Sequence, residues 1–291
     1  MNTARTIPLP AWATRIYQHM TVRERLLFAW LVLLLVISGV LTVIGYVGRN
    51  TELIPQTGGT YEEAAVGQPR HINPIVALAN DVDIDLTHLI YSSLFKLDGE
   101  LQLQNDLATG YELSEDNTTY TVSLRSDVTW HDGEPFTADD VVFTIRSIQT
   151  PDYNSPVQSH FEQVVVEKVD DYTVTFTLEQ PYAPFLSSLT VGMVPEHVWE
   201  SVAPQNATLA EQMLKPVGSG PYQFAELKTR RKTGEITEFH LTRNEAYYGE
   251  HQLLDEVVFH FFNSHDEALN ALAAGTVDGV GFLPLQLKSE A

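Results

Sequence analysis

Two pairs of neighbouring side chains have the types and spacing that could carry chemistry. Asp139 and Asp140 stand together, as paired carboxylates do in some general acid–base sites, and His131 precedes Asp132, a pair that suits a metal ion. The aspartates also have a structural explanation. The run from Thr137 to Asp140 has the form of a helix N-terminal capping box, and both carboxylates suit the positive end of a helix dipole.

We therefore expect no enzyme, metal site or cofactor. Adjacent residues of a strand point to opposite faces, so His131 and Asp132 would not bind one ion together. The sequence also has no helical His-x-x-x-His spacing, no Gly-x-Ser-x-Gly elbow, no phosphate loop and no dinucleotide fingerprint. A membrane-tethered hydrolase stays open as an alternative, although it would need a nucleophile and base that the pattern does not display.

The charge of the chain is strongly asymmetric. Residues 1–50 hold five arginines and one glutamate, whereas the rest holds 12 basic and 37 acidic residues, a net of −25. Such a surface repels phosphates, so nucleic acid is not an expected partner. The chain has no cysteine, which excludes disulfides, thiolate metal sites and a cysteine nucleophile.

Residues 26–48 form an uncharged apolar run, long enough to cross a hydrocarbon core of about 30 Å. Arg15, Arg23 and Arg25 precede it, so the positive-inside rule predicts a single-pass anchor, with residues 1–25 in the cytoplasm and the bulk of the chain outside the cell membrane. Residues 49–59 would be a tether. Cleavage after the run, which would release a soluble protein, stays open as the alternative.

The apolar spacing predicts alternating strands and helices beyond the tether. Period-two alternation predicts a half-buried strand at Tyr120–Leu124, and helical spacing predicts one helix within residues 86–94 and another after Thr137. Further strands are expected at residues 60–66, 161–168, 172–178, 222–226, 236–242, 255–262 and 277–282. A helix capped by Ser264 and ended by Gly275 separates the last two, which is the pattern of a parallel sheet. Gly218 and Gly220 are expected to allow close backbone packing or positive φ, with a hinge as the other reading.

Five ordered blocks resemble the family 5 extracellular solute-binding proteins, the peptide- and nickel-binding receptors of bacterial ABC importers. The longest runs from Leu107 to Ile145 and includes Trp130, Asp132-Gly133, Pro135 and Ala138-Asp139-Asp140-Val141. The others are Ile72-Asn73-Pro74, residues 91–97, the loop from Gly218 to Tyr222, and residues 241–248, where Tyr248 replaces the family's tryptophan.

The resemblance implies an α/β fold with mixed sheets, a type II periplasmic-binding-protein lobe with an inserted subdomain. Lobe one would comprise residues 60–91 and 193–262, and the inserted subdomain residues 92–192. Residues 263–291 would begin a second lobe, most of which is absent from this chain.

The resemblance also implies where a ligand would bind. Leu78, Ala79, Asn80 and Asp81 would run beside a peptide backbone like an added strand. Val157 stands where relatives carry a cleft tyrosine after Ser-Pro, and His160 lies nearby. The implied function is capture of peptides or similar small solutes and their delivery to an ABC permease and its ATPase subunits. A tethered sensor or scaffold that kept the binding fold is the second alternative.

Overall fold

The computed structural model describes residues 20–51, 56–77 and 80–284, and these form two units that are treated separately. The first unit holds helix α2 (Val22–Asn50), the one described helix whose length and apolar composition suit a membrane span. Its first turn is closed by a capping box, in which the Thr21 amide donates to Glu24 Oε2 at 2.7 Å. Its apolar side chains are exposed all round, as a membrane span requires.

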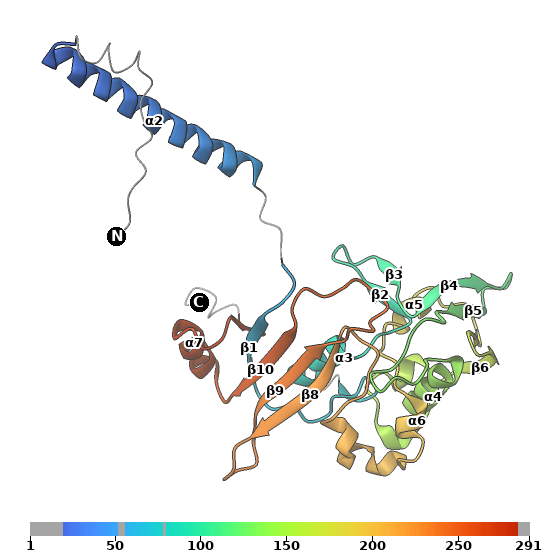
Figure 1. Cartoon of the computed structure of the whole chain (residues 1–291). Helices are drawn as coiled ribbons and strands as arrows, with labels where there is room; N and C mark the ends of the chain where they lie inside the picture. The colour runs from blue at the N-terminus through green and yellow to red at the C-terminus, as the bar shows by residue number, and fades with distance from the viewer. Residues whose placement is uncertain (1–19, 52–55, 78–79, 285–291) are drawn as a thin grey trace. The chain divides into compact units, whose positions relative to one another are not determined.

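The second unit is built on a five-stranded sheet with the order β11-β1-β10-β9-β8 (Figure 1). Its strands are β1 (Thr60–Val66), β8 (Tyr222–Thr229), β9 (Ile236–Arg243), β10 (Glu256–Phe262) and β11 (Gly279–Val280). Strand β1 is parallel to both β10 and β11, and helix α7 (His265–Ala273) makes the crossover between those two. The predicted strand–helix–strand unit is thus confirmed, with β1 inserted between its strands.

The two faces of this sheet differ in polarity. One face carries Phe239, Leu241 and Phe259, all buried, and α3 (Asp81–Ile90) packs against β8. The opposite face carries charged residues, and His240 lies 2.8 Å from carboxylates on both sides, Glu238 and Glu256. Strand alternation explains the difference, since successive side chains point to opposite faces.

A second sheet of four antiparallel strands has the order β4-β5-β7-β6. Its strands are β4 (Ala108–Leu113), β5 (Thr119–Leu124), β6 (Val164–Asp170) and β7 (Thr173–Leu178), and α4 (Ala138–Gln149) packs on β6 and β7. The unit also contains the hairpin β2 (Phe95–Leu97) and β3 (Leu103–Asn105) and two short helices, α5 (Phe185–Ser188) and α6 (Glu196–Trp199), the second of which packs on α4. Short 3-10 turns occupy residues 151–153, 158–160, 204–209 and 211–213.

Several predicted boundaries need correction. The helix expected within residues 86–94 is α3, which begins five residues earlier because the side chain of Asn80 caps it. It stops at Ile90 because Ser92 and Ser93 instead bond to Met193 and bridge to Gly192. Strands β3 and β4 were not predicted, and β6 begins three residues later than expected.

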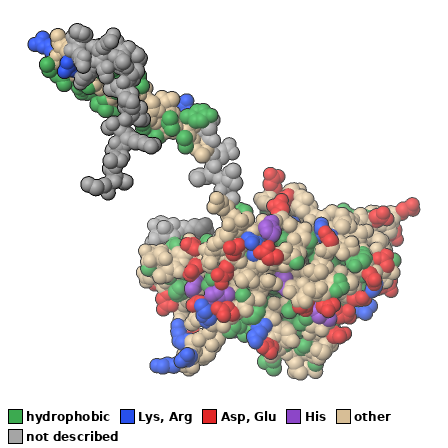
Figure 2. Space-filling model, viewed as in Figure 1, with side chains coloured by type: hydrophobic (Ala, Val, Ile, Leu, Met, Phe, Trp, Pro, Cys, Tyr) green, Lys and Arg blue, Asp and Glu red, His purple; other side chains and the backbone are tan. Residues whose placement is uncertain are grey.

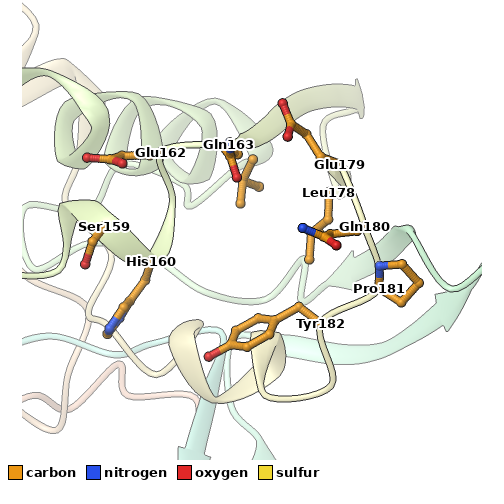
Figure 3. Close-up of a pocket in the computed structure, with 10 residues that line it drawn as sticks. Ser159, His160, Glu162, Gln163, Leu178, Glu179, Gln180, Pro181 and Tyr182 are labelled. Atoms are coloured by element: carbon orange, nitrogen blue, oxygen red, sulfur yellow. The ribbon is translucent and has the colours of Figure 1, made fainter.

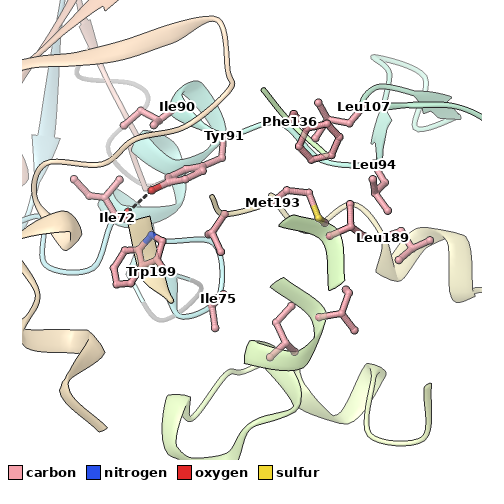
Figure 4. Close-up of a cluster of buried hydrophobic side chains, with 14 of the residues drawn as sticks. Ile72, Ile75, Ile90, Tyr91, Leu94, Leu107, Phe136, Leu189, Met193 and Trp199 are labelled. Atoms are coloured by element: carbon pink, nitrogen blue, oxygen red, sulfur yellow. Dashed lines mark hydrogen bonds between the residues drawn. The ribbon is translucent and has the colours of Figure 1, made fainter. Parts of the chain in front are cut away.

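One hydrophobic core joins both sheets of the second unit. Figure 4 shows side chains from the end of α3, from the 72–75 turn, from the segment before α6 and from α6 itself packed together, with Tyr91 donating to Ile72 O at 3.4 Å. Trp130 is 2% exposed and belongs to this core. The continuous core holds the four-stranded sheet against the five-stranded one.

Candidate functional site

A hollow of about 260 Å³ lies at the carboxyl ends of the parallel strands β1 and β11. The first residues of α3 and α7 form its sides. Its lining residues are Ala65, Val66, Asp81, Val82, Asp85, His265, Gly281, Phe282 and Pro284. Ligands of open α/β sheets bind outside the carboxyl ends of the strands, so this edge hollow has the position of a binding site.

The edge hollow is negatively charged. Asp81 and Asp85 line it, and none of the described residues that line it is a lysine or an arginine. Burial raises the pKa of Asp85 to about 6, with further contributions from the charges of Glu63 and Asp81. Carboxylates crowded together without a cation favour a positively charged group, such as an ammonium, placed between them.

Hydrogen bonds at the start of α3 fix the position of this edge. Asn80 accepts from the Val82 amide at 3.3 Å and donates to Gln68 O at 2.9 Å. Asp83 is buried and accepts from the amides of Arg70 and His71 at 2.7 and 3.0 Å. The loop after β1 is therefore tied to the helix that borders the hollow.

The predicted ligand segment lies partly at this edge. Leu78 and Ala79 fall outside the described residues. The side chain of Asn80 caps α3, and its amide and carbonyl bond to Ala77 O and to the Ile84 amide. The exposed Asp81 lines the edge hollow. Their role in binding stays a prediction.

A second hollow, about 470 Å³, lies on the four-stranded-sheet side of the unit (Figure 3). Residues 159–164 border one side and residues 178–182 the other, with Glu162, Glu179 and Tyr182 among the polar groups. His160 is exposed and lines it, whereas Val157 is half-buried against the core and does not. The structure thus separates these two predicted contacts.

A third and smaller hollow, about 80 Å³, lies between α3 and the segment from Thr190 to Gly192. Ala77, which directly precedes the predicted ligand segment, lines it together with His88. Gly192 is required here, because a Cβ at that position would stand 2.8 Å from the Pro74 ring.

His131 does not lie in a strand as expected but in a turn, and both ring nitrogens hold the loop from Gly218 to Gly220. The Gly218 amide donates to Nδ1 at 3.1 Å, which places the proton on Nε2, 3.1 Å from Gly220 O. Burial lowers the pKa of His131 to about 4, so the ring stays neutral at pH 7. The imidazole is a structural clasp, and its neighbour Asp132 pairs with His197 instead.

The two neighbouring aspartates are engaged by the fold. Asp140 accepts from the amides of Thr137 and Glu196, each at 2.9 Å, and from Trp130 Nε1 at 3.3 Å. Asp139 pairs with Lys168 at 2.7 Å. The predicted capping box is confirmed, and neither carboxylate lines a hollow described above. Among the described residues, no three His, Asp or Glu side chains are grouped to hold a metal ion.

Sequence reasoning did not single out Asp85 or the edge hollow. The signal was present, because strands 60–66 and 277–282 were both predicted and the crevice beyond parallel strands is the expected ligand position. The missing step was the strand order, which places β11 beside β1.

The sequence resembles known solute-binding proteins over most of its length. Residues 102–290 match the model of the bacterial extracellular solute-binding proteins, family 5. The chain is 30% identical over 230 residues to the oligopeptide-binding protein AppA of Bacillus subtilis, covering 77% of this chain and 41% of that protein. It is also 30% identical over 225 residues to a putative ABC transporter peptide-binding protein of Brucella ovis, covering 75% and 40%. The chain thus spans about two fifths of the length of these relatives.

Solved structures give the same picture. AppA of Bacillus subtilis in complex with a nonapeptide aligns with a TM-score of 0.70 at 30% identity, covering 77% of this chain and 44% of that one. NikZ of Campylobacter jejuni in complex with Ni(L-His) aligns with a TM-score of 0.66 at 30% identity, covering 75% and 42%. The mixed α/β architecture is therefore that of periplasmic binding proteins, and the chain belongs to the family 5 bacterial extracellular solute-binding proteins.

Proposed function

We propose that this chain is the solute-capturing part of an ABC importer receptor, which binds peptides or similar small solutes outside the membrane and performs no covalent chemistry. The observation that carries this proposal is the match to peptide-binding relatives in both sequence and fold. The solute would pass to a permease, with transport driven by its ATPase subunits. The apolar helix α2 would anchor the receptor, with residues 1–25 in the cytoplasm.

The proposal divides the second unit into two lobes and an inserted subdomain. Residues 60–91 and 193–262 would form lobe one, which contains four strands of the five-stranded sheet, and residues 92–192 the inserted subdomain, which contains the four-stranded sheet. Residues 263–291 would begin lobe two. A ligand would lie at the carboxyl edge of β1 and β11, beside residues 78–81.

The edge hollow supports a ligand with a positively charged group. Asp81 and Asp85 line it, and burial together with the charges of Glu63 and Asp81 raises the pKa of Asp85. An ammonium between the two aspartates would offset the repulsion between their charges. A peptide supplies such a group at its amino terminus or on a lysine. His160 would contribute a separate contact from the larger hollow.

Thermal unfolding of the full-length chain in detergent tests the proposal, with peptides, sugars and nickel chelates added in turn. A peptide at 100 times its Kd stabilises the folded state by about 2.7 kcal/mol. Unchanged unfolding with every peptide refutes peptide binding, and a shift with a sugar or a chelate alone reassigns the solute.

The position of the site is tested with Asp85→Asn and a matched control, Glu179→Gln in the larger hollow. We expect Asp85→Asn to weaken binding of a peptide with a free amino terminus several-fold and to leave its N-acetylated form unaffected. Weaker binding with Glu179→Gln and unchanged binding with Asp85→Asn would assign the contact with the positively charged group to the larger hollow instead.

A further inference from the structure

The hairpin between β8 and β9 ends in a basic tip, residues 228–235, that inverts the charge of the surrounding surface. Four of the 12 basic residues beyond position 50 lie within five positions there, and Glu235 is the one acidic residue of the segment. Figure 2 shows their blue side chains at a projecting end of a domain whose acidic side chains are spread over the visible surface. The four basic residues are Lys228, Arg230, Arg231 and Lys232.

The tip has a defined backbone. The Arg230 amide donates to Glu235 O and the Gly234 amide to Arg230 O, both at 2.8 Å, while Gly234 adopts a φ of +74°. Arg230 also pairs with Glu235 at 2.7 Å. The turn therefore presents Arg231 and Lys232 outward at its apex.

These two apical residues carry charge that the described part of the domain leaves uncompensated. Lys228 pairs with Glu238 at 2.7 Å, but Arg231 and Lys232 are exposed and have no ion pair among the described residues. Two adjacent free cations on a projecting turn fit an anionic surface, whereas the rest of the domain would be repelled by the same surface.

The place of the tip in the sheet limits which surface it reaches. The tether joins the sheet at Thr60, which pairs with Glu256, and Glu256 pairs with Thr242 near the end of β9. The β8–β9 hairpin extends beyond the opposite end of the sheet, where Ala64 pairs with His260. Eight residues of β8 and the turn span about 30 Å. Residues 51–57, between the end of α2 and the Gly58 amide that donates to Leu253 O, reach about 24 Å when extended. With the strands tilted from the bilayer normal, this length lets the tip reach the bilayer that holds α2.

We propose that the basic tip docks on anionic lipid headgroups of the bilayer in which the chain is anchored. This rests on the anchored, extracytoplasmic placement proposed above. A basic residue near an anionic membrane surface contributes about 1 kcal/mol, or roughly fivefold in the docking equilibrium. The acidic remainder of the domain would disfavour other orientations, so the tip would also fix which side of the domain faces the membrane.

The absence of cysteine makes a direct test possible. Thr229→Cys, at an exposed position beside the turn, carries a single donor dye, and the full-length chain is reconstituted in vesicles that contain acceptor lipids. We expect higher energy transfer in vesicles with 30% phosphatidylglycerol than in phosphatidylcholine alone, and loss of the difference in high salt. Arg231→Glu with Lys232→Glu should abolish the difference.

The matched control is Arg70→Glu with Arg146→Glu, two exposed arginines without an ion pair among the described residues. It makes the same change in net charge elsewhere on the domain and should preserve the lipid dependence. Equal energy transfer in the two kinds of vesicle overturns the docking proposal and would point to an acidic protein surface as the partner instead. Equal loss of the lipid dependence in both double variants overturns it as well. Failure of the chain to float with either vesicle refutes the anchor, and the docking proposal with it.

Discussion

Replacement of Gly218 by alanine tests how tightly the loop that follows residue 217 is held. A Cβ at this position would stand 2.0 Å from Ile90 O and 2.7 Å from its carbonyl carbon. Favourable contact needs roughly 3.5 Å, so the loop or the end of α3 has to move by more than about 1 Å. Gly218 does not have a positive φ, so the cost comes from this close approach.

That movement would break the hydrogen bonds that hold the loop. Gly220 donates to Ile90 O at 2.8 Å, the His131 amide donates to Gly218 O at 2.8 Å, and the imidazole makes the two bonds to the loop described above. Each contributes about 1 kcal/mol, and overpacking costs about 1–3 kcal/mol by itself. We therefore expect Gly218→Ala to lower the free energy of unfolding by about 3 kcal/mol.

Urea unfolding of the full chain in detergent, followed by tryptophan fluorescence, measures this loss. The matched control is Gly110→Ala, because nothing lies within 4 Å of a Cβ there. Its stability should stay within about 0.5 kcal/mol of the wild type. A Gly218→Ala chain as stable as the control would show that the loop shifts freely, and the hinge reading of its glycines would then replace the packing one.

Three other changes follow from the same structure. Asp140→Ala removes the acceptor of three hydrogen bonds and should lower the free energy of unfolding in urea by about 3–5 kcal/mol. Asp139→Ala breaks one exposed ion pair and should lower it by less than about 1 kcal/mol. Similar losses would contradict the assignment of Asp140 as a buried acceptor and Asp139 as a surface residue. The pKa of His131 is about 4 in the folded state and about 6.5 in the unfolded state. The neutral ring therefore contributes its full stabilisation of the folded state above pH 6.5, and about 3 kcal/mol of it is lost as the pH falls to 4. Curves of stability against pH should differ between wild type and His131→Gln in this window, and equal slopes would refute the buried neutral ring. The pKa of Asp85 is raised to about 6, so its charge destabilises the folded state above that pH. Asp85→Asn should therefore raise the melting temperature at pH 7.5, with a gain in stability of roughly 1 kcal/mol after allowance for solvent screening. The gain should vanish by pH 4, and a gain that persists there would have another cause.

Local sequence signals determined the elements whose causes lie within a few residues. The capping box at Thr137 and the N-cap Ser264 predicted the starts of α4 and α7, because the side chains of both caps bond to residues three positions away. Alternation of apolar and polar residues predicted β5 and β7, since one face of each is buried. The uncharged run after Arg25 likewise predicted a long apolar helix.

Only the tertiary structure decided how distant segments meet. The sequence around Asp140 accounts for its bond to Thr137 but not for its bond to the Glu196 amide, 56 residues away. The clasp of His131 on Gly218 joins residues 87 apart, and the edge hollow exists because β11 pairs with β1. Periodicity states which face of an element is apolar and leaves its partner open, because many pairings bury a similar apolar area. Strand order and loop contacts therefore placed Asp81 and Asp85 at one edge.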